Sequence, residues 1–509
     1  MKRLDRIDII FYATLTLSLY WLLQLMRGST FFFDEWDFIL HRDFNLNDLL
    51  RPHNGHFSFF PVLTYVSLRE IFGIESYVPY QVAGLIVHGS VCIAVYKIIS
   101  RHSRGIAFAS GFLVALLGSG WQNILWPFQI GMMGAFSAGL WALYELQRDE
   151  VGPWRIASLI GISLACAGGG IAFAGAIGFT LVISRKWRVI RAFIPVLLLY
   201  ALWYWNYGVS QTQSGNLAKT PQYILDSALA SAAGVGGRTI VFGSCVLGVL
   251  LVLFSQWMFG RRNFVTVTAM VVFLLFTWFL TGLSRAHLGE PSASRYVYIG
   301  AIGLIVVGGL LLPAGTRLGH LIVISCITVF LLQPNLRMMR AGAGGLKDTS
   351  LHLTAQLAAL ELAADEKTVD FTVDAMRAPQ VSSNDYLSQS RKFGSTAMSW
   401  DQVIEASDSV ISGVNRTIMN ATSSFEKLDR SECDGNAIER QLILEPGDQA
   451  EIQVSQVVQL GFNWINSVED SAFKIDVNSP GVYSIRNPEF RKPMRLVVSG
   501  NTQSTSLCN

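Results

Sequence analysis

The chain has 509 residues, of which 51% are hydrophobic and 15% are charged, and its formal net charge is +3. The charged residues stand in short clusters between long apolar segments, which is typical of a polytopic membrane protein and not of a soluble globular domain. A net charge this small gives no reason to expect nucleic acid as a partner.

A helix that crosses a bilayer needs about 20 mostly apolar residues. Eleven segments fit this pattern: 8–26, 77–99, 105–120, 130–146, 155–168, 170–184, 189–206, 239–258, 264–283, 296–312 and 318–334. Glycines at 168–170 divide the run 155–184 into two short helices that turn back on each other. Basic clusters alternate between loops, as at Lys2 and Arg3 or at Arg261 and Arg262, which places the N-terminus in the cytoplasm. The first segment keeps its basic flank and has no small-residue cleavage site behind it, so we expect a retained helix.

Eleven spans put the C-terminus outside, and residues 335–509 are polar enough to form a separate soluble domain after the membrane domain 1–334. Leucines at helical spacing predict a helix near 350–367, whereas 441–444, 451–454 and 495–498 read as strands between Pro-Gly turns. We therefore expect an extracytoplasmic α+β domain. Its cysteines, Cys433 and Cys508, could form a disulfide in an oxidising compartment, although their spacing alone does not decide this.

The first outer loop, residues 27–76, begins with the acidic residues Asp34, Glu35 and Asp37 among aromatic side chains. Burial disfavours the charged form of a carboxylate, so these surroundings would raise the proton affinity of Asp34 toward the working pH. A carboxylate in this state could act as a general base. The alternative is a plain capping and loop acid cluster at a membrane surface.

The same loop continues with two short helices, 47–51 and 61–73, which we expect along the bilayer surface. The alternative of a span over 59–74 is disfavoured because charged residues interrupt it. His53 and His56 lie between these helices, three residues apart, a spacing that could share a divalent cation with a nearby carboxylate. Contact with substrate, or ordinary hydrogen bonding in a wet loop, are the other interpretations of the pair.

The last outer loop of the membrane domain carries Arg285, His287, Arg295 and Tyr296. The forked donors of arginine suit phosphate oxygens, so Arg285 and Arg295 are candidates to bind a lipid phosphate, with Tyr296 as a further donor. His287 is a candidate substrate contact. The alternative is that the arginines reach lipid headgroups or pair with acids of the terminal domain.

Two other outer segments offer weaker candidates. The loop 207–238 contains Lys219 and Arg238, which could assist in substrate binding, and this loop could also cover the site. The aromatic segment 121–129 carries tryptophans that favour a bilayer interface, with stacking on a sugar as the minor alternative.

The order of these motifs resembles the GT-C superfamily of membrane glycosyltransferases, which includes O-antigen-modifying glucosyltransferases. The resemblance is carried by Phe33-Asp34-Glu35 after the first span, and by His53-Asn54-Gly55-His56 before Phe60-Pro61-Val62-Leu63-Thr64-Tyr65. In that superfamily an acidic motif follows the first helix, two surface helices come next, and a soluble domain often ends the chain. The resemblance covers the N-terminal third by motif and the rest by topology alone.

The resemblance implies an inverting transfer of a hexose, with glucose as the specific expectation, from a polyprenyl-phosphate donor to a glycan or lipid-linked glycan such as O-antigen. Asp34 would be the base, while Glu35 and Asp37 would position acceptor hydroxyls or hold a cation. Some members use a divalent cation, so no cofactor is certain. The implied location is a bacterial inner membrane, with a cytoplasmic N-terminus, a periplasmic terminal domain and membrane lipid around the spans.

Two other classes of protein remain open on the sequence. An O-antigen polymerase or ligase has a similar number of spans and outward arginines, but it would not depend on an acidic cluster after the first helix. A lipid flippase or transporter needs a polar pathway through its helices, whereas 239–258 and 264–283 carry no charge.

Overall fold

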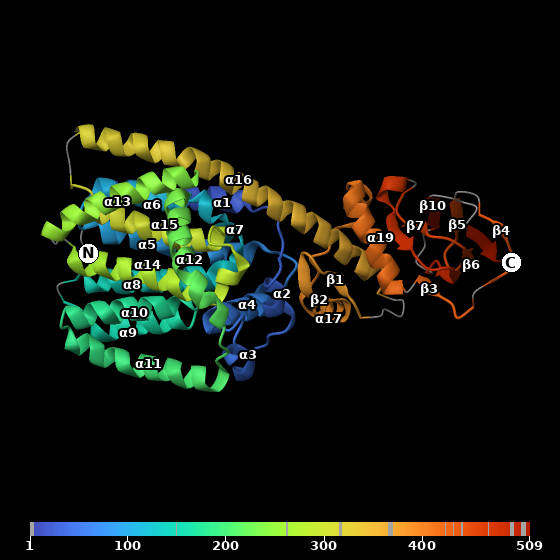
Figure 1. Cartoon of the computed structure of the whole chain (residues 1–509), viewed down its shortest axis with the longest axis horizontal. Coiled ribbons are helices and arrows are strands. Elements are labelled where there is room, and N and C mark those ends of the chain that lie inside the picture. The colour runs from blue at the N-terminus through green and yellow to red at the C-terminus, as the bar shows by residue number, and fades with distance from the viewer. Residues whose placement is uncertain are drawn as a thin grey trace. The chain divides into compact units, whose positions relative to one another are not determined.

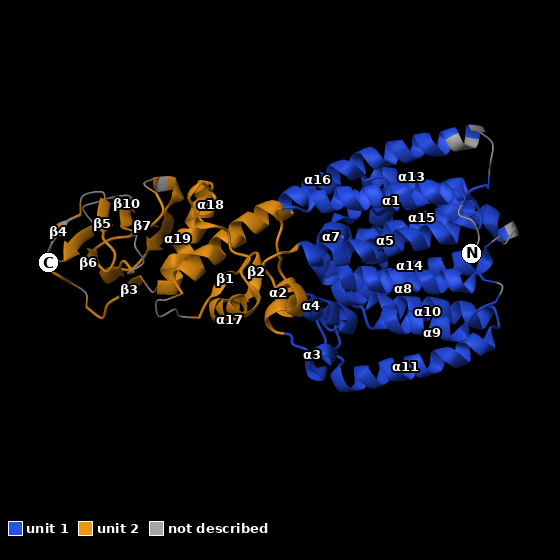
Figure 2. Cartoon of the chain, turned by 180° about the vertical axis from the view of Figure 1, so that it is seen from behind, with its two compact units in different colours: residues 1–27, 42–68, 78–345 blue, residues 28–41, 69–77, 346–509 orange. Residues whose placement is uncertain are grey.

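The computed structural model describes residues 5–148, 150–260, 263–314, 318–364, 370–422, 424–430, 432–438, 441–466, 468–488, 493–499 and 505–508. The chain forms two compact units, shown in Figure 2. Unit 1 comprises residues 1–27, 42–68 and 78–345, and unit 2 comprises 28–41, 69–77 and 346–509. Two parts of the first outer loop therefore belong to unit 2, whereas the sequence assigned the whole loop to the membrane domain. The basic pair Arg261 and Arg262 lies outside the described residues.

Unit 1 is a bundle of helices that lie side by side in Figure 1. Its elements are α1 (Arg6–Leu25), α3 (Leu46–Leu50), α4 (Phe59–Phe72), α5 (Val78–Ser100), α6 (Arg104–Ala115), η1 (Gly118–Gly120), α7 (Trp121–Leu125), η2 (Pro127–Gln129), α8 (Ile130–Leu146), α9 (Pro153–Leu164), α10 (Gly169–Ile183), α11 (Trp187–Tyr207), η3 (Ser214–Lys219), α12 (Thr220–Val235), α13 (Ile240–Gly260), α14 (Phe264–Arg285), η4 (Ala286–Leu288), α15 (Ser294–Leu311) and the first part of α16 (Leu318–Leu362). The short helices α3 and α4 match the two that the sequence predicted in the first outer loop.

All eleven predicted spans are helical, but the count of eleven membrane crossings is not confirmed. Among the described residues, seven helices are long and apolar enough to cross a membrane, and α6 with the segment after it forms an eighth if that bent pair is one span. The helices α8, α9 and α10 have 17, 12 and 15 residues and fall short of a full crossing. The predicted break between α9 and α10 does occur, since α10 begins at Gly169.

The segment 207–238, which the sequence predicted as a loop, contains the 16-residue helix α12. Small residues line its buried face, including Ser231 and Gly234, and α12 packs against α13, α14 and α15. The packing is so close that a methyl group added at Gly300 would collide with the Ser231 hydroxyl. Small residues allow such approach between membrane helices, although their polarity made this stretch look like a loop.

Helix α16 has 45 residues and continues through Pro334, so the predicted domain boundary at residue 335 lies inside a helix. A proline within a helix removes the N–H that would bond the carbonyl four residues earlier, here that of Phe330. The guanidinium of Arg238 donates to this carbonyl at 3.2 Å and lies 3.8 Å from the Phe330 ring. Arg238, a weak phosphate candidate on the sequence, thus satisfies the backbone group that Pro334 leaves open.

Unit 2 combines helices with short antiparallel strands. Its elements are α2 (Glu35–Leu40), the end of α16, β1 (Thr372–Asp374), β2 (Ala378–Ser382), α17 (Ser383–Phe393), α18 (Trp400–Ile404), α19 (Asp408–Thr422), β3 (Phe425–Lys427), β4 (Gly435–Ala437), β5 (Gln441–Leu444), β6 (Gln449–Val454), β7 (Val458–Asn463), η5 (Glu469–Ser471), β8 (Phe473–Val477), β9 (Gly481–Arg486), β10 (Met494–Ser499) and β11 (Thr505–Cys508). The three strands that the sequence predicted correspond to β5, β6 and β10.

The C-terminal part of unit 2, from β3 to β11, is a sandwich of two antiparallel sheets, with strand orders β5-β10-β7-β8 and β3-β9-β6-β11-β4. Inward residues of both sheets share one hydrophobic cluster with α19 and the end of α16, including Phe462, Ile485 and Val414. Cys433 and Cys508 form a disulfide, and Cys508 pairs with Gly435 in the β4–β11 ladder. The terminal part is therefore α+β, as the sequence predicted, and the pairing that the sequence left open is present.

Candidate functional site

The acidic segment is part of unit 2 and begins at a strained residue. Phe33 has a positive φ of 49°, a conformation that residues with a side chain seldom adopt, and its N–H donates to the carbonyl of Arg377 at 3.0 Å. Asp34 follows as the cap of α2. The backbone turn at Phe33 thus sets the direction in which the Asp34 side chain points.

Asp34 is half-buried, and its Oδ1 accepts a hydrogen bond of 2.8 Å from Nε2 of Gln380 on β2. The two residues are 346 positions apart in the sequence. A hydrogen bond of this length from an amide fixes the rotation of the carboxyl group. Gln380, in the C-terminal half of the chain, therefore orients Asp34, which lies near the N-terminus.

Glu35 is fully buried, with 0% of its surface exposed. Its carboxylate accepts hydrogen bonds from the Tyr77 hydroxyl at 2.8 and 2.9 Å and from the Phe32 N–H at 2.8 Å. These contacts tie residues 32–35 to the end of the first outer loop within unit 2. The sequence suggested that Glu35 positions acceptor hydroxyls or holds a cation, whereas in the structure its carboxylate holds the acidic segment in place.

Asp37 belongs to a chain of titratable groups that ends on α17. Nδ1 of His41 lies 3.5 Å from Asp37, and Nε2 of His41 lies 3.2 Å from Asp385. The hydrogen bond to Asp37, together with that to Asp385, raises the pKa of His41 against the opposing effect of burial. The hydroxyl of Ser382 and the same imidazole lower the pKa of Asp385. Both carboxylates thus favour a protonated His41 between them.

His53 and His56 lie in unit 1 on the two sides of a tight turn. Each N–H donates to the carbonyl of the other, at 3.0 and 2.9 Å, and the two central residues, Asn54 and Gly55, have positive φ values of 47° and 73°. This is the two-residue hairpin for which Asn-Gly is the favoured sequence. The His-Asn-Gly-His motif therefore encodes a turn that holds both imidazoles at fixed, paired positions.

His56 lies close to Arg285, the last residue of α14. Burial, followed by the neighbouring Arg285 guanidinium and then by His53, lowers the pKa of His56 to about 4. The imidazole is consequently neutral at pH 7 and can donate one hydrogen bond and accept another. Gly168, before α10, leaves room for it, because a Cβ at that position would lie 2.8 Å from Nδ1 of His56.

Arg295 and Tyr296 lie in the first turn of α15 and are partly buried. The Arg295 guanidinium is 5.0 Å from the Tyr296 ring and 3.5 Å from the exposed carboxylate of Glu290. Tyr223 of α12 interacts electrostatically with Tyr296, Arg295 and Arg285. Both predicted arginines and Tyr296 thus lie within electrostatic range of one tyrosine that the sequence did not single out.

The remaining candidates of unit 1 lie at the edge of this group. His287 is exposed, and its Nδ1 is 3.1 Å from Nδ2 of Asn216 in η3. The same amide donates to the Leu283 carbonyl at 3.0 Å, which fastens η3 to the end of α14. Lys219 ends η3 and is exposed. Gln211, earlier in this segment, lies beside Gly55 of the histidine turn.

The described part of the chain contains no group of three or more His, Cys, Asp or Glu side chains arranged to hold a metal ion. The structure therefore gives no support to the idea that His53 and His56 share a cation with a carboxylate. Their spacing is explained by the turn that they flank.

The predicted site residues fall into two groups. Asp34, Glu35 and Asp37 belong to unit 2, and His53, His56, Arg285, Arg295 and the other candidates belong to unit 1. Sequence reasoning missed the partners within each group: Gln380, Tyr77, His41 and Asp385 in unit 2, and Tyr223 and Asn216 in unit 1. His41 alone carried a signal, since it lies four residues after Asp37 at the end of a short helix.

Comparisons with known proteins add little to this geometry. No protein-family model matches the chain, and no curated protein matches it. A solved structure of ArnT from Cupriavidus metallidurans, bound to undecaprenyl phosphate, is similar with a TM-score of 0.43 and 13% sequence identity, over 70% of this chain and 80% of that one. A TM-score below 0.5 does not establish a common fold, so the function must be inferred from the residues of this chain.

Proposed function

We propose that this chain is a membrane glycosyltransferase that moves a hexose from a polyprenyl-phosphate donor to a glycan acceptor outside the cytoplasm. In its most specific form, the proposal names glucose as the sugar and O-antigen as the acceptor. The apolar helices supply a place for a lipid donor, and the disulfide Cys433–Cys508 supports a terminal domain in an oxidising compartment.

The observation that carries the proposal is that Arg285, Arg295 and Tyr296 all lie within electrostatic range of Tyr223. The neutral imidazole of His56 lies close to Arg285. Two guanidinium groups at the ends of apolar helices suit a phosphate that is attached to a lipid chain. His56 adds hydrogen bonding without adding charge. When a donor binds, its phosphate could replace the exposed carboxylate of Glu290 as the ionic partner of Arg295.

In the proposed reaction the acceptor hydroxyl oxygen attacks the anomeric carbon of the sugar. The bond from that carbon to the phosphate oxygen breaks, and polyprenyl phosphate leaves with the electron pair. Asp34 takes the proton of the hydroxyl, with its carboxyl group oriented by Gln380. A single displacement of this kind inverts the anomeric configuration. Arg285 and Arg295 would stabilise the charge that grows on the leaving phosphate.

The test measures transfer of labelled glucose from polyprenyl-phosphate glucose by the purified full chain, alongside a separate measurement of donor binding. We expect Asp34→Asn to lower kcat by about 10²–10⁴-fold with donor affinity unchanged, since it removes only the base. The matched control is Asp43→Asn, which changes an exposed aspartate of the same loop and should keep full activity.

The basic group is tested by the donor dissociation constant. We expect Arg285→Gln combined with Arg295→Gln to weaken donor binding by about 10²–10⁴-fold, because hydrogen bonds to charged groups contribute about 1.5–3 kcal/mol each. A wild-type kcat in Asp34→Asn would contradict the assignment of Asp34 as the base, and failure of the wild-type chain to transfer glucose at all would leave a polymerase or ligase as the better interpretation. Unchanged donor binding in the arginine variant would contradict the assignment of the phosphate site.

A further inference from the structure

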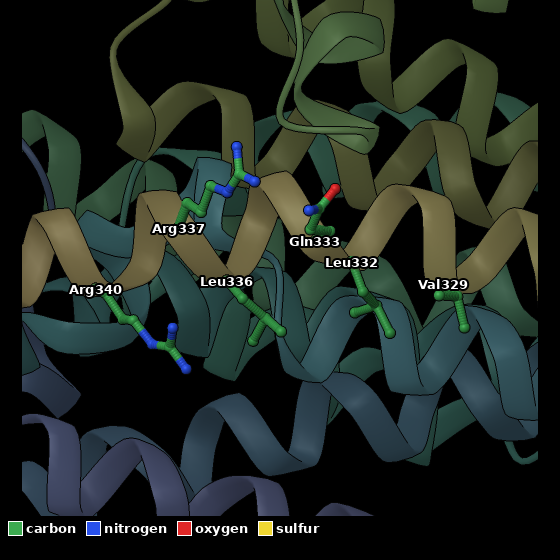
Figure 3. A pocket seen from close by; sticks show the side chains of 6 residues that line it. All are labelled: Val329, Leu332, Gln333, Leu336, Arg337 and Arg340. Carbon is green, nitrogen blue, oxygen red and sulfur yellow. The ribbon is translucent and has the colours of Figure 1, made fainter.

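Helix α16 carries a surface groove within unit 1, on the same stretch of the helix as Phe330 and Pro334 (Figure 3). The groove has a volume of about 440 Å³. Its six lining residues all belong to α16, and they are Val329, Leu332, Gln333, Leu336, Arg337 and Arg340. A volume of this size falls within the range of small-molecule sites.

The sequence of α16 explains the groove. Residues four positions apart form ridges on a helix, and here the row 329, 333, 337 runs beside the row 332, 336, 340. Figure 3 shows Val329, Leu332, Leu336 and Arg340 pointing to one side of the helix, with Gln333 and Arg337 pointing to the other. Each row begins with an apolar residue and ends with an arginine, so the groove is apolar at one end and cationic at the other. It runs from Val329 to Arg340, which is twelve residues or about 16 Å along the helix axis.

The apolar part of this helix is largely exposed, as expected of a helix that faces lipid. Only 17% of its most apolar window is buried, and Ile327, Val329 and Phe330 are 52–67% exposed. Arg337 and Arg340 are exposed as well, and neither guanidinium has a hydrogen-bonding or ionic partner among the residues that the structure describes. Arginines just beyond an apolar stretch reach the level of the lipid headgroups.

We propose that this groove binds an anionic phospholipid of the bilayer, with one hydrocarbon chain along Val329, Leu332 and Leu336, the phosphate at Arg340 on the same side of the helix, and the exposed Arg337, three residues earlier, turned toward that phosphate. The forked donors of two guanidinium groups match phosphate oxygens. A zwitterionic headgroup would bring an ammonium group beside two arginines, which charge repulsion disfavours. The site is separate from the donor site proposed above, and its test does not depend on activity.

A second copy of the chain is a poorer occupant. In a dimer related by a twofold axis along the membrane normal, the same residues of both copies meet at the same depth. Arg337 and Arg340 of each copy would then face those of the other, four guanidinium groups without described partners. Charge complementarity therefore favours a lipid phosphate.

The experiment uses the full chain in mild detergent, stripped of lipid and then mixed with phosphatidylglycerol or phosphatidylcholine. Bound lipid is counted by native mass spectrometry. We expect one phosphatidylglycerol to be retained by the wild type, and its affinity to fall about tenfold or more in Arg337→Gln combined with Arg340→Gln. Arg188→Gln with Arg191→Gln, an exposed pair of equal spacing on α11, is the matched control and should retain the lipid.

A second variant fills the groove without removing charge. Val329→Trp places a large ring on an exposed position, so the fold should tolerate it, and we expect it to displace the lipid chain. Three results would overturn the proposal: lipid retained by the 337/340 variant, equal loss in the 188/191 control, or a dimer that forms in the wild type and dissociates in Val329→Trp. Equal affinity for phosphatidylcholine would overturn the choice of an anionic lipid.

Discussion

The acidic segment of unit 2 and the basic group of unit 1 are built in opposite ways. Asp34, Glu35 and Asp37 each have a side-chain partner within hydrogen-bonding or ion-pair distance, namely Gln380, Tyr77 and His41. In the basic group, Arg295 is paired with a carboxylate that is 61% exposed. One region is fixed by hydrogen bonds from other parts of unit 2, those of Glu35 being buried, and the other meets an exchangeable surface acid.

This difference fits the roles that we propose. A base must already point in the required direction when the acceptor arrives, because reorientation during the reaction would add to the barrier. A phosphate site must instead release its ligand after each turnover, and a surface ion pair is weak enough to be replaced. The comparison predicts that loss of the buried carboxylate in the acidic segment lowers the stability of the fold. Substitutions in the basic group should instead change the pKa of neighbouring side chains.

The largest effect should come from Glu35→Ala. It leaves the Tyr77 hydroxyl and the Phe32 N–H buried without their acceptor, at about 1–3 kcal/mol for each group. We expect the free energy of unfolding to fall by about 3 kcal/mol, measured as a lower thermal midpoint in detergent. Glu35→Gln keeps one acceptor oxygen and should lose less. An unchanged midpoint for Glu35→Ala would show that the acidic segment is not held in this way.

A smaller loss is expected at the histidine turn of unit 1. Gly55→Ala forces a residue with a Cβ into the positive φ of 73°, which costs about 1–2 kcal/mol. Asn54→Gly is the matched control, since glycine adopts the same conformation without strain. We expect the alanine variant to unfold earlier and to bind the lipid donor less tightly, because His56 loses its fixed position. Equal donor binding by both variants would show that the position of His56 does not matter for binding the donor.

The sequence predicted the parts of this structure that depend on local periodicity. All eleven apolar segments are helical, the break before α10 occurs, and three predicted strands are present, because each signal extends over neighbouring residues. The Asn-Gly turn was not predicted, although Asn-Gly is a local signal for it, because the spacing of its histidines was interpreted as a possible metal site or substrate contact.

The remaining features depend on residues far apart in the chain. Gln380 holds Asp34 across 346 positions, and no periodicity marks such a pair. Pro334 would be expected to end a helix, and only the position of Arg238 explains why α16 continues. Helix α12 was missed because its Ser, Ala and Gly residues resemble a loop until the packing partner is known.

The basic group makes a prediction about charge. Arg285 is one cause of the lowered pKa of His56, after burial. We expect Arg285→Gln to raise this pKa above about 4 while leaving it below the ordinary value of 6.5, since the burial remains. The titration can be followed by NMR of histidine-labelled protein, with His56→Gln to assign the signal. A His56 that titrates unchanged would place Arg285 too far away to share a ligand with it.

The smallest effect should appear at His41, in the acidic segment. Its pKa is raised above 6.5 in the folded chain, so the charged imidazole stabilises the fold fully below pH 6.5, and this contribution disappears as the pH rises through the folded-state pKa. We expect His41→Gln to lower the thermal midpoint more at pH 5.5 than at pH 8.5. His102→Gln is the control, because His102 bonds the Leu312 carbonyl at 2.7 Å instead of two carboxylates. A deficit that is constant with pH would mean that Asp37 and Asp385 hold a neutral imidazole.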